Sequence, residues 1–172
     1  MKPSSRPPPL TVRAVDRVLE LGVQPWLMGI VNASPDSFSD GGRRTMLEDQ
    51  ARLAEELQAA GADILDIGGE SARTDRPPLA AAEEIERVVP LIEHAAGELG
   101  AIVSADTYKP SVARAAIAAG AVIVNDTSGL RDPRLAEVCA ETGAALVIMH
   151  TLAPPGRSSS GLKSRPRKGS TA

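Results

Sequence analysis

The chain has 172 residues, of which 42% are hydrophobic and 24% charged, and its formal net charge at pH 7 is −3. These values fit one globular domain and argue against a nucleic-acid-binding surface. Aromatic residues make up only 2%, so the core is expected to consist of Ala, Val, Leu and Ile, as in buried parallel strands. The single cysteine, Cys139, excludes an internal disulfide framework and predicts a reducing, cytoplasmic compartment. No apolar run approaches the roughly 18 residues of a membrane span.

Residues 1–9 contain four prolines and no periodic apolar residues, and we predict that they are disordered. Residues 10–22 are compatible with either a short helix or a pair of strands. From residue 27 on, apolar runs of strand length alternate with segments of helical periodicity. The expected strands are 27–32, 62–68, 101–107, 122–126 and 145–150.

The helices between these strands carry start and stop signals. Pro110 occupies a first helical position, and Asp132 is expected to be an N-cap. Pro90 is expected to kink the second helix, since it removes a backbone donor. Three glycines follow the ends of helical segments and predict their C-termini: Gly61, Gly120 and Gly143.

Repeated strand–helix units predict a parallel sheet, and this pattern alone leaves doubly wound and barrel architectures open. No GxGxxG motif follows the first strand, which weakens the dinucleotide-binding alternative. Polar residues end strand after strand, as on the active-site face of an α/β barrel; they are Asn32, Glu70, Asp106, Asn125, Asp126 and His150. We therefore expect an α/β fold of the (β/α)8 TIM-barrel type over residues 10–153, incomplete with about five of its eight strands.

The pattern stops after the fifth strand. Residues 154–172 contain five basic residues and no acid, without a strand or helix pattern, and we predict a disordered basic tail. A complete barrel needs roughly 200–250 residues. We therefore expect the chain to be a truncated or frameshifted version of a longer protein, which folds poorly and turns over slowly at best.

Four ordered motifs carry a family resemblance. The stretch "LMGIVNASPDSFSDGG" resembles the first signature of dihydropteroate synthases, and "GADILDIGGESAR" resembles the second. The strands that follow in this family are similar, in order and spacing, to "SADTYKPSVARAAIAAGAVIVNDTSGL" and "AETGAALVIMH". The resemblance covers residues 27–151. It implies a folate-pathway transferase that condenses (7,8-dihydropterin-6-yl)methyl diphosphate with 4-aminobenzoate, uses Mg²⁺ and forms a homodimer at full length. Neither nucleic acid nor membrane is an expected partner.

The resemblance also implies site residues. Asn32 is assigned to the metal that holds the diphosphate, although an Asn at a strand end often just begins a turn. Asp106 and Asn125 are assigned to pterin recognition and catalysis. A carboxylate accepts hydrogen bonds and a carboxamide both donates and accepts, so the pair can recognise the edge of a pterin. A carboxylate can also stabilise the positive charge that develops as diphosphate leaves. Without the resemblance, Asp106 is as well explained as a cap of the next helix.

Three further residues are assigned to substrate binding. Phe38, in a loop able to close over a ligand, is implied to contact the aminobenzoate ring. Arg73 lies in a loop that shapes the same subsite, and Met149 is implied to contact the pterin, although core packing explains it equally well. Lys109 and Arg114 are expected on a solvated helix face.

The sequence departs from the family pattern in three respects, one of which is that the family's "SIDTYK" is "SADTYK" here, with less packing beside Asp106. The family's "ESTRPG" is "ESARTD" here, so Ala72 lacks a hydroxyl and Thr74 lacks the stiffness of proline. An Asp, a Lys and an Arg–His pair from the family's later strands have no counterpart. Two alternatives therefore stay open: a non-catalytic pterin-binding paralogue, and the pterin-binding domain of a corrinoid-dependent methyltransferase. The loop "NASPDSFSDGG" argues against the second.

Overall fold

The computed structural model describes residues 10–22, 24–33, 43–70 and 78–150. Its centre is a parallel sheet of five strands, whose spatial order is their order in the chain. The strands are β3 (Met28–Asn32), β4 (Ile64–Gly68), β5 (Ile102–Asp106), β6 (Ile123–Asp126) and β7 (Ala145–Ile148). Each lies inside one of the ranges predicted from the sequence, so the predicted strands are confirmed.

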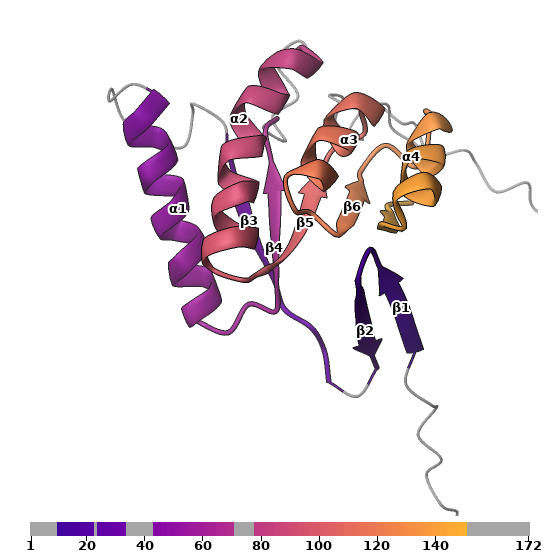
Figure 1. Ribbon diagram of the computed structural model, residues 1–172, viewed down its shortest axis with the longest axis horizontal. Helices are drawn as coiled ribbons and strands as arrows, with labels where there is room; N and C mark the ends of the chain where they lie inside the picture. The colour runs from indigo at the N-terminus through magenta and orange to yellow at the C-terminus, as the bar shows by residue number, and fades with distance from the viewer. Residues whose placement is uncertain (1–9, 23, 34–42, 71–77, 151–172) are drawn as a thin grey trace, which may run out of the picture.

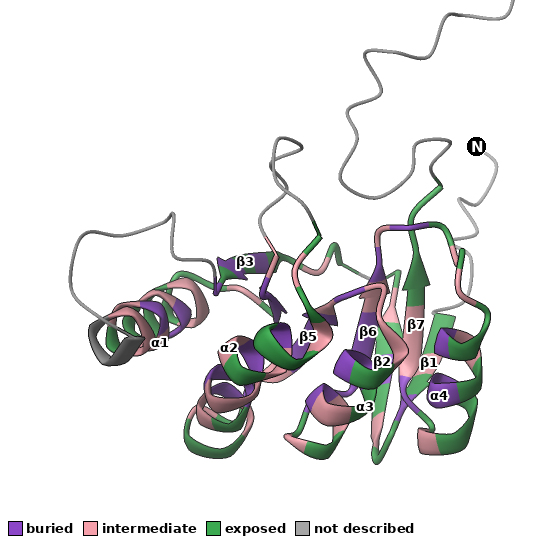
Figure 2. Ribbon diagram, turned by 90° about the horizontal axis from the view of Figure 1, so that it is seen from above, coloured by how far each residue is buried: buried purple, intermediate pink, exposed green. Residues whose placement is uncertain are grey.

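In the described part of the chain, four α-helices alternate with the strands. They lie along one face of the sheet (Figures 1 and 2). They are α1 (Arg43–Ala59), α2 (Ala81–Glu93), α3 (Pro110–Ala118) and α4 (Arg134–Thr142). A doubly wound sheet reverses its strand order and carries helices on both faces. Sequential order with helices on one side is instead the arrangement of an α/β barrel, which confirms the expected fold class for the described strands.

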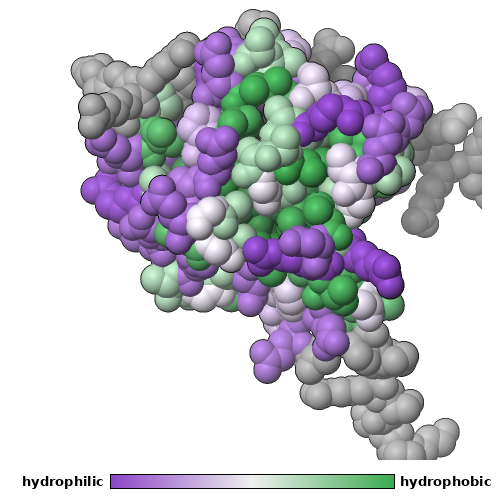
Figure 3. All heavy atoms as spheres, in the orientation of Figure 1, coloured by the Kyte–Doolittle hydropathy of each residue, from purple (hydrophilic) through white to green (hydrophobic). Residues whose placement is uncertain are grey.

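The main hydrophobic core lies between this helical layer and the sheet. Strand residues that face the helices, such as Val31, Ile67 and Val103, are fully buried. α2 contributes Leu91 and Ile92, both 0% exposed. Burying side chains of this size stabilises the fold by roughly 1.5–3 kcal/mol each. Hydrophilic residues dominate the solvent side of α1, at the left of Figure 3. No helix in the described part of the chain is long and apolar enough to cross a membrane.

Residues 10–22 form a hairpin, so the strand pair is the correct alternative. β1 (Leu10–Ala14) and β2 (Arg17–Leu21) pair antiparallel around a two-residue turn. The hairpin packs at the amino ends of the parallel strands, where Ala14 and Leu19 share a buried cluster with Ile64. The backbone amide of Val15 also donates to the carbonyl of Gly143 over 2.8 Å. The hairpin therefore leaves the opposite, carboxyl ends of the strands accessible.

Two predicted helix details can be followed in the structure. α2 contains Pro90 and continues as a π-helix, His94–Glu98, so the helix does not end at this proline, and the predicted kink stays a prediction. The N-cap of α4 is Pro133 and not Asp132 as predicted. The carboxylate of Asp132 still accepts the backbone amide of Arg134 over 3.1 Å, so it satisfies a free amide of the first turn from one position earlier. The segments predicted to be disordered, 1–9 and 154–172, lie outside the described residues.

Candidate active site

Three of the predicted site residues lie in one row across the sheet. Strand register pairs Asn32 with Gly68, Gly68 with Asp106, and Asp106 with Asn125. Paired residues of parallel strands point to the same face, and here that face is the one without helices. The structure thus brings Asn32, Asp106 and Asn125 to one level at the carboxyl ends of β3, β5 and β6.

Gly68 gives the Asp106 side chain its place in this row. A Cβ atom at Gly68 would lie 3.2 Å from Oδ2 of Asp106 and 3.3 Å from its Cβ, so the carboxylate rests against the bare backbone. Among the described residues Asp106 caps no helix: the N-cap of α3 is Lys109, and it makes no side-chain cap bond. The helix-cap interpretation of Asp106 is therefore wrong.

The environment of Asp106 is strongly acidic. Burial, together with the nearby carboxylates of Asp66, Glu84, Glu70 and Asp126, raises its pKa from 3.8 to about 7. Such a shift follows from desolvation of the charged form and from like charges close by. A site with this potential favours a cation, or a ligand on which positive charge develops.

Asp66 lies on β4 two residues before Gly68, so its side chain is on the same face of the sheet as the row. It is 4% exposed and accepts a hydrogen bond from Nδ2 of Asn125 over 3.0 Å. Burial raises the pKa of Asp66 above its ordinary value, and the side chains of Ser104 and Asn125 oppose this rise only in part. An acid inside an otherwise apolar strand was the signal that could have singled it out from the sequence.

Asp126 serves the loop after β6. Its carboxylate accepts the backbone amides of Ser128, over 2.8 Å, and of Leu130. Leu130 has a positive φ of 57°, so these bonds hold the loop in a conformation that a leucine rarely adopts. Asp126 is thus a turn-forming residue.

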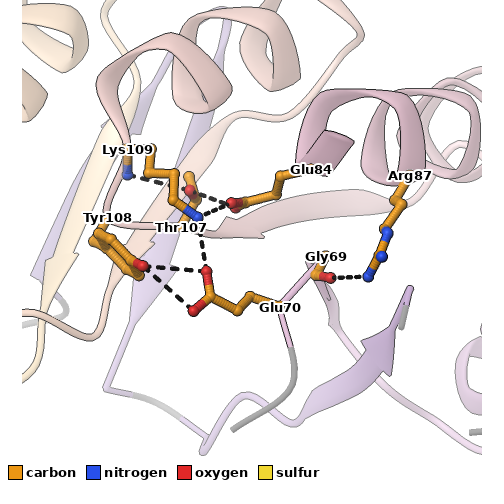
Figure 4. A network of polar contacts seen from close by, with 7 residues as sticks. All are labelled: Gly69, Glu70, Glu84, Arg87, Thr107, Tyr108 and Lys109. Atoms are coloured by element: carbon orange, nitrogen blue, oxygen red, sulfur yellow. Dashed lines mark hydrogen bonds and ion pairs between the residues drawn. The ribbon is translucent and has the colours of Figure 1, made fainter. Parts of the chain in front are cut away.

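A polar network ties the carboxyl ends of β4 and β5 to α2 (Figure 4). Lys109 bridges two acids: its Nζ lies 2.7 Å from Glu70 and also contacts Glu84. Thr107 donates to Glu84 over 2.7 Å, and Tyr108 donates to Glu70 over 3.1 Å. From α2, Arg87 donates to the carbonyl of Gly69 over 3.2 Å.

The prediction that Lys109 is solvated is therefore wrong. Its side chain is 14% exposed and that of Glu84 only 2%. Arg114, by contrast, lies at the surface, with a side chain 56% exposed and paired with Glu141. Because Lys109 and Glu84 stand 25 residues apart in the chain, spacing alone gave no signal that they meet.

The remaining predicted residues are placed as follows. Met149 follows β7, is 44% exposed, and donates its backbone amide to the carbonyl of Asp126 over 2.9 Å, so it lies beside the row without being packed in the core. His150 is exposed as well. Phe38, Arg73 and the departures at Ala72 and Thr74 lie outside the described residues.

The protein oxygen atoms available here fit a cation that takes most of its ligands from phosphate and water. No group of three or more His, Cys, Asp or Glu side chains within the described ranges could hold a metal ion by itself. Asn32 offers an exposed amide oxygen at the end of β3, and its carbonyl is held by Nε2 of Gln50 over 3.1 Å. Mg²⁺ commonly takes one or two protein oxygens and completes its shell with phosphate and water. Asn32 suits that kind of site.

Comparison with known proteins shows the family to which the sequence motifs pointed. The sequence profile of the family described as pterin binding enzyme matches residues 28–167. The dihydropteroate synthase of Bacillus subtilis is 48% identical over 125 residues, which are 72% of this chain and 44% of that protein. A structure of Xanthomonas albilineans dihydropteroate synthase with 4-aminobenzoic acid is 42% identical, with a TM-score of 0.76, over 83% of this chain and 53% of the other.

A structure of Burkholderia cenocepacia dihydropteroate synthase complexed with 7,8-dihydropteroate is 41% identical, with a TM-score of 0.71. The match covers 86% of this chain and 48% of that one. The chain thus spans about half the length of these relatives.

Proposed function

The chain belongs to the pterin binding enzyme family, as the resemblance in its sequence indicated, and from this premise we propose that it contributes the pterin-recognising strands of a dihydropteroate synthase. The proposed reaction joins (7,8-dihydropterin-6-yl)methyl diphosphate to 4-aminobenzoate. The bond between the pterin methylene carbon and the diphosphate oxygen breaks, and the oxygen keeps the electron pair. The amine nitrogen of 4-aminobenzoate bonds to that carbon and loses one proton, which gives 7,8-dihydropteroate and diphosphate.

The observation that carries the proposal is the row of Asn32, Asp106 and Asn125 at one level of the sheet. Asp106 and Asn125 are register neighbours, so both can contact one planar ring. Asn32 lies two strands away from Asp106, on the side where the diphosphate would extend. This order, from ring to leaving group, matches the two parts of the proposed substrate.

Asp106 is the proposed catalytic residue for loss of diphosphate. Positive charge develops on the methylene carbon and spreads into the pterin ring as the carbon–oxygen bond breaks. The acids that raise the pKa of Asp106 stabilise that charge in advance, without any rearrangement during the reaction. Lys109 keeps Glu70 and Glu84 in place around the site.

Mg²⁺ is the proposed cofactor, with Asn32 as the protein ligand. The metal would supply neutralisation of the negative charge on the leaving diphosphate. This assignment rests on the exposed amide of Asn32 at the strand end and on the absence, among the described residues, of a metal site built from protein side chains alone.

The second substrate is proposed to be 4-aminobenzoate, with Phe38 and Arg73 as its contacts and Met149 at the pterin ring. The similar Xanthomonas albilineans structure contains 4-aminobenzoic acid, which supports this substrate. Glu70, held by Lys109 and Tyr108, directly precedes the segment that contains Arg73. A homodimer for the full-length enzyme and a cytoplasmic location belong to the same proposal, the latter because the buried Cys139 is a free thiol.

Product formation tests the proposal. The protein is incubated with both substrates and Mg²⁺, and 7,8-dihydropteroate is separated by chromatography. We expect product, and a rate lower by about 100-fold in Asp106→Asn, as for loss of one preorganised electrostatic group. Arg114→Gln, on the exposed side of α3, is the control and should keep the rate. Saturable pterin binding without any product would instead identify a non-catalytic pterin-binding protein.

A further inference from the structure

Resting on the proposed function, we propose that Asp66 is a positioning residue that holds the Asn125 carboxamide with its nitrogen toward the sheet and its oxygen toward the ligand. The site then presents acceptors to the pterin ring and selects a ring that carries an exocyclic amine.

Two buried acids near the row differ in what their burial achieves. Asp126, 0% exposed, has both carboxylate oxygens bonded by backbone amides, and it shapes a loop. Asp66, 4% exposed, accepts a hydrogen bond from the side chain of Asn125 through Oδ2, and its Oδ1 has no hydrogen-bond partner among the described residues. The hydroxyl of Ser104, its register neighbour on β5, also acts on it and lowers its pKa. A buried carboxylate is costly unless hydrogen bonds compensate it. Loop formation explains Asp126, whereas Asp66 is bonded to the side chain of a residue of the site.

The chemistry of the contact sets its direction. An ionised carboxylate can only accept a hydrogen bond, so the carboxamide must turn its NH₂ group toward Asp66. The Asn125 oxygen then points away from Asp66. A hydrogen bond to a charged acceptor is about twice as strong as a neutral one, which favours this orientation over the flipped one.

The strand register determines which side chains the ligand ring contacts. Asn125 and Asp106 are paired across β5 and β6, so the ring meets an amide oxygen beside a carboxyl group. Two adjacent acceptors require two donors on the ligand. On 7,8-dihydropterin the adjacent donors are N3–H and the exocyclic 2-amine, whereas N1, between the amine and N8–H, is an acceptor. Asp66 therefore favours 2-amino over 2-oxo pteridines.

The first test needs no ligand. Hydrogen exchange of the Asn125 side-chain NH₂, followed by NMR, reports whether the amide is held. We expect exchange at least fivefold faster in Asp66→Asn than in wild type. Glu141→Gln removes an exposed carboxylate of α4 outside the row and serves as the control, with Asn125 exchange unchanged. Equal Asn125 exchange in wild type and Asp66→Asn would overturn the proposal.

The second test measures ligand preference. Binding of 2-amino-4-oxopteridine and 2,4-dioxopteridine is measured by fluorescence titration. We expect wild type to prefer the amino compound at least tenfold, since a site that bonds a donor rejects an analogue lacking it. In Asp66→Asn the neutral amide no longer dictates the orientation of Asn125, and the preference should fall about tenfold. Glu141→Gln should keep it.

Exchanging the side chains of positions 66 and 125 distinguishes a positioning role of Asp66 from a general loss of structure. In the double variant Asp66→Asn, Asn125→Asp, the nitrogen at position 66 donates to the new carboxylate, whose second oxygen faces the ligand. Preference for the amino compound should return. A double variant no more selective than Asp66→Asn, or a wild-type preference that Asp66→Asn leaves intact, would overturn the role of Asp66. Absence of pterin binding by wild type would instead contradict the proposed function, while the exchange measurement still decides whether Asp66 holds Asn125.

Discussion

Asp106 lies against the backbone of Gly68, among acids that raise its pKa to about 7. This shift has a consequence for stability. Below about pH 4 the carboxyl group is protonated in folded and unfolded chains alike. Between its ordinary pKa of 3.8 and its folded pKa of about 7, the folded chain keeps a proton that the unfolded chain has released. Stability contributed by this proton is therefore present at low pH and is lost as pH rises toward 7.

The first prediction follows from this loss of stability with rising pH. Relative to Asp106→Asn, which does not titrate, the wild type should lose roughly 1–3 kcal/mol of unfolding free energy between pH 4 and pH 7.5. Urea denaturation of both proteins at the two pH values measures the difference. If the unfolding free energy changed equally in wild type and variant between the two pH values, Asp106 would have an ordinary pKa.

The second prediction concerns Gly68. An added methyl group at this position would lie 3.2 Å from the Asp106 carboxylate, whose side chain can move aside. We expect Gly68→Ala to fold but to bind pterin about tenfold more weakly, because the carboxylate is displaced from its place in the row. Gly97→Ala, where φ is not in the left-handed region and an added Cβ meets nothing within 4 Å, is the control for the stability effect of a glycine replacement. Unchanged pterin affinity in Gly68→Ala would contradict the geometry.

For single residues, the sequence predicted neighbours correctly where a residue ends a strand. Asp106 and Asn125 could be predicted as neighbours because parallel strands end at the same edge of a sheet. Asp66 and Lys109 could not, since their partners stand 59 and 25 residues away, and pairing across that distance depends on tertiary packing.

At the scale of elements, the Lys109–Glu84 pair joins α2 to the end of β5 (Figure 4). Alternation of apolar runs with helical periodicity was enough to predict the strands and helices that this pair connects. Residues 10–22 remained ambiguous because Val12, Val18 and Leu19 fit either spacing. The pairing of β1 with β2 and contacts with the strand ends decided in favour of a hairpin.

The third prediction tests that link. Lys109→Met leaves the buried Glu84 without its cation and should lower the free energy of unfolding by about 3 kcal/mol. Combining it with Glu84→Gln should recover part of the loss, because no uncompensated buried charge remains. Arg114→Met breaks an exposed pair with Glu141 and should change stability by less than about 1 kcal/mol. Equal losses for Lys109→Met and Arg114→Met in denaturant titrations would refute a buried role for Lys109.

For the molecule as a whole, the sheet face without helices combines the polar site with exposed apolar side chains. Ile30 is 62% exposed and Val147 45% exposed, on the two outermost strands, β3 and β7. Exposed apolar side chains on unpaired strand edges favour association. The barrel type could be predicted from the strand–helix repeat and strand-end polarity, whereas exposure of these residues could be read only from the structure.

The fourth prediction follows from this exposure. Ile30→Thr should reduce concentration-dependent self-association in sedimentation velocity and change the free energy of unfolding by less than about 0.5 kcal/mol. Val31→Thr, one residue along the strand but fully buried against the helices, should destabilise the protein clearly. Self-association that Ile30→Thr leaves unchanged would place the contact elsewhere.

Pterin recognition at the carboxyl ends of β3 to β6 is the central claim, and chemical-shift mapping tests it most directly. The ¹⁵N-labelled protein is titrated with (7,8-dihydropterin-6-yl)methyl diphosphate in the presence of Mg²⁺. We expect saturable shifts that cluster at Asn32, Gly68, Asp106 and Asn125. Shifts confined to the groove between α3 and α4, lined by Arg114 and Glu137, or no saturable shifts at all, would contradict it.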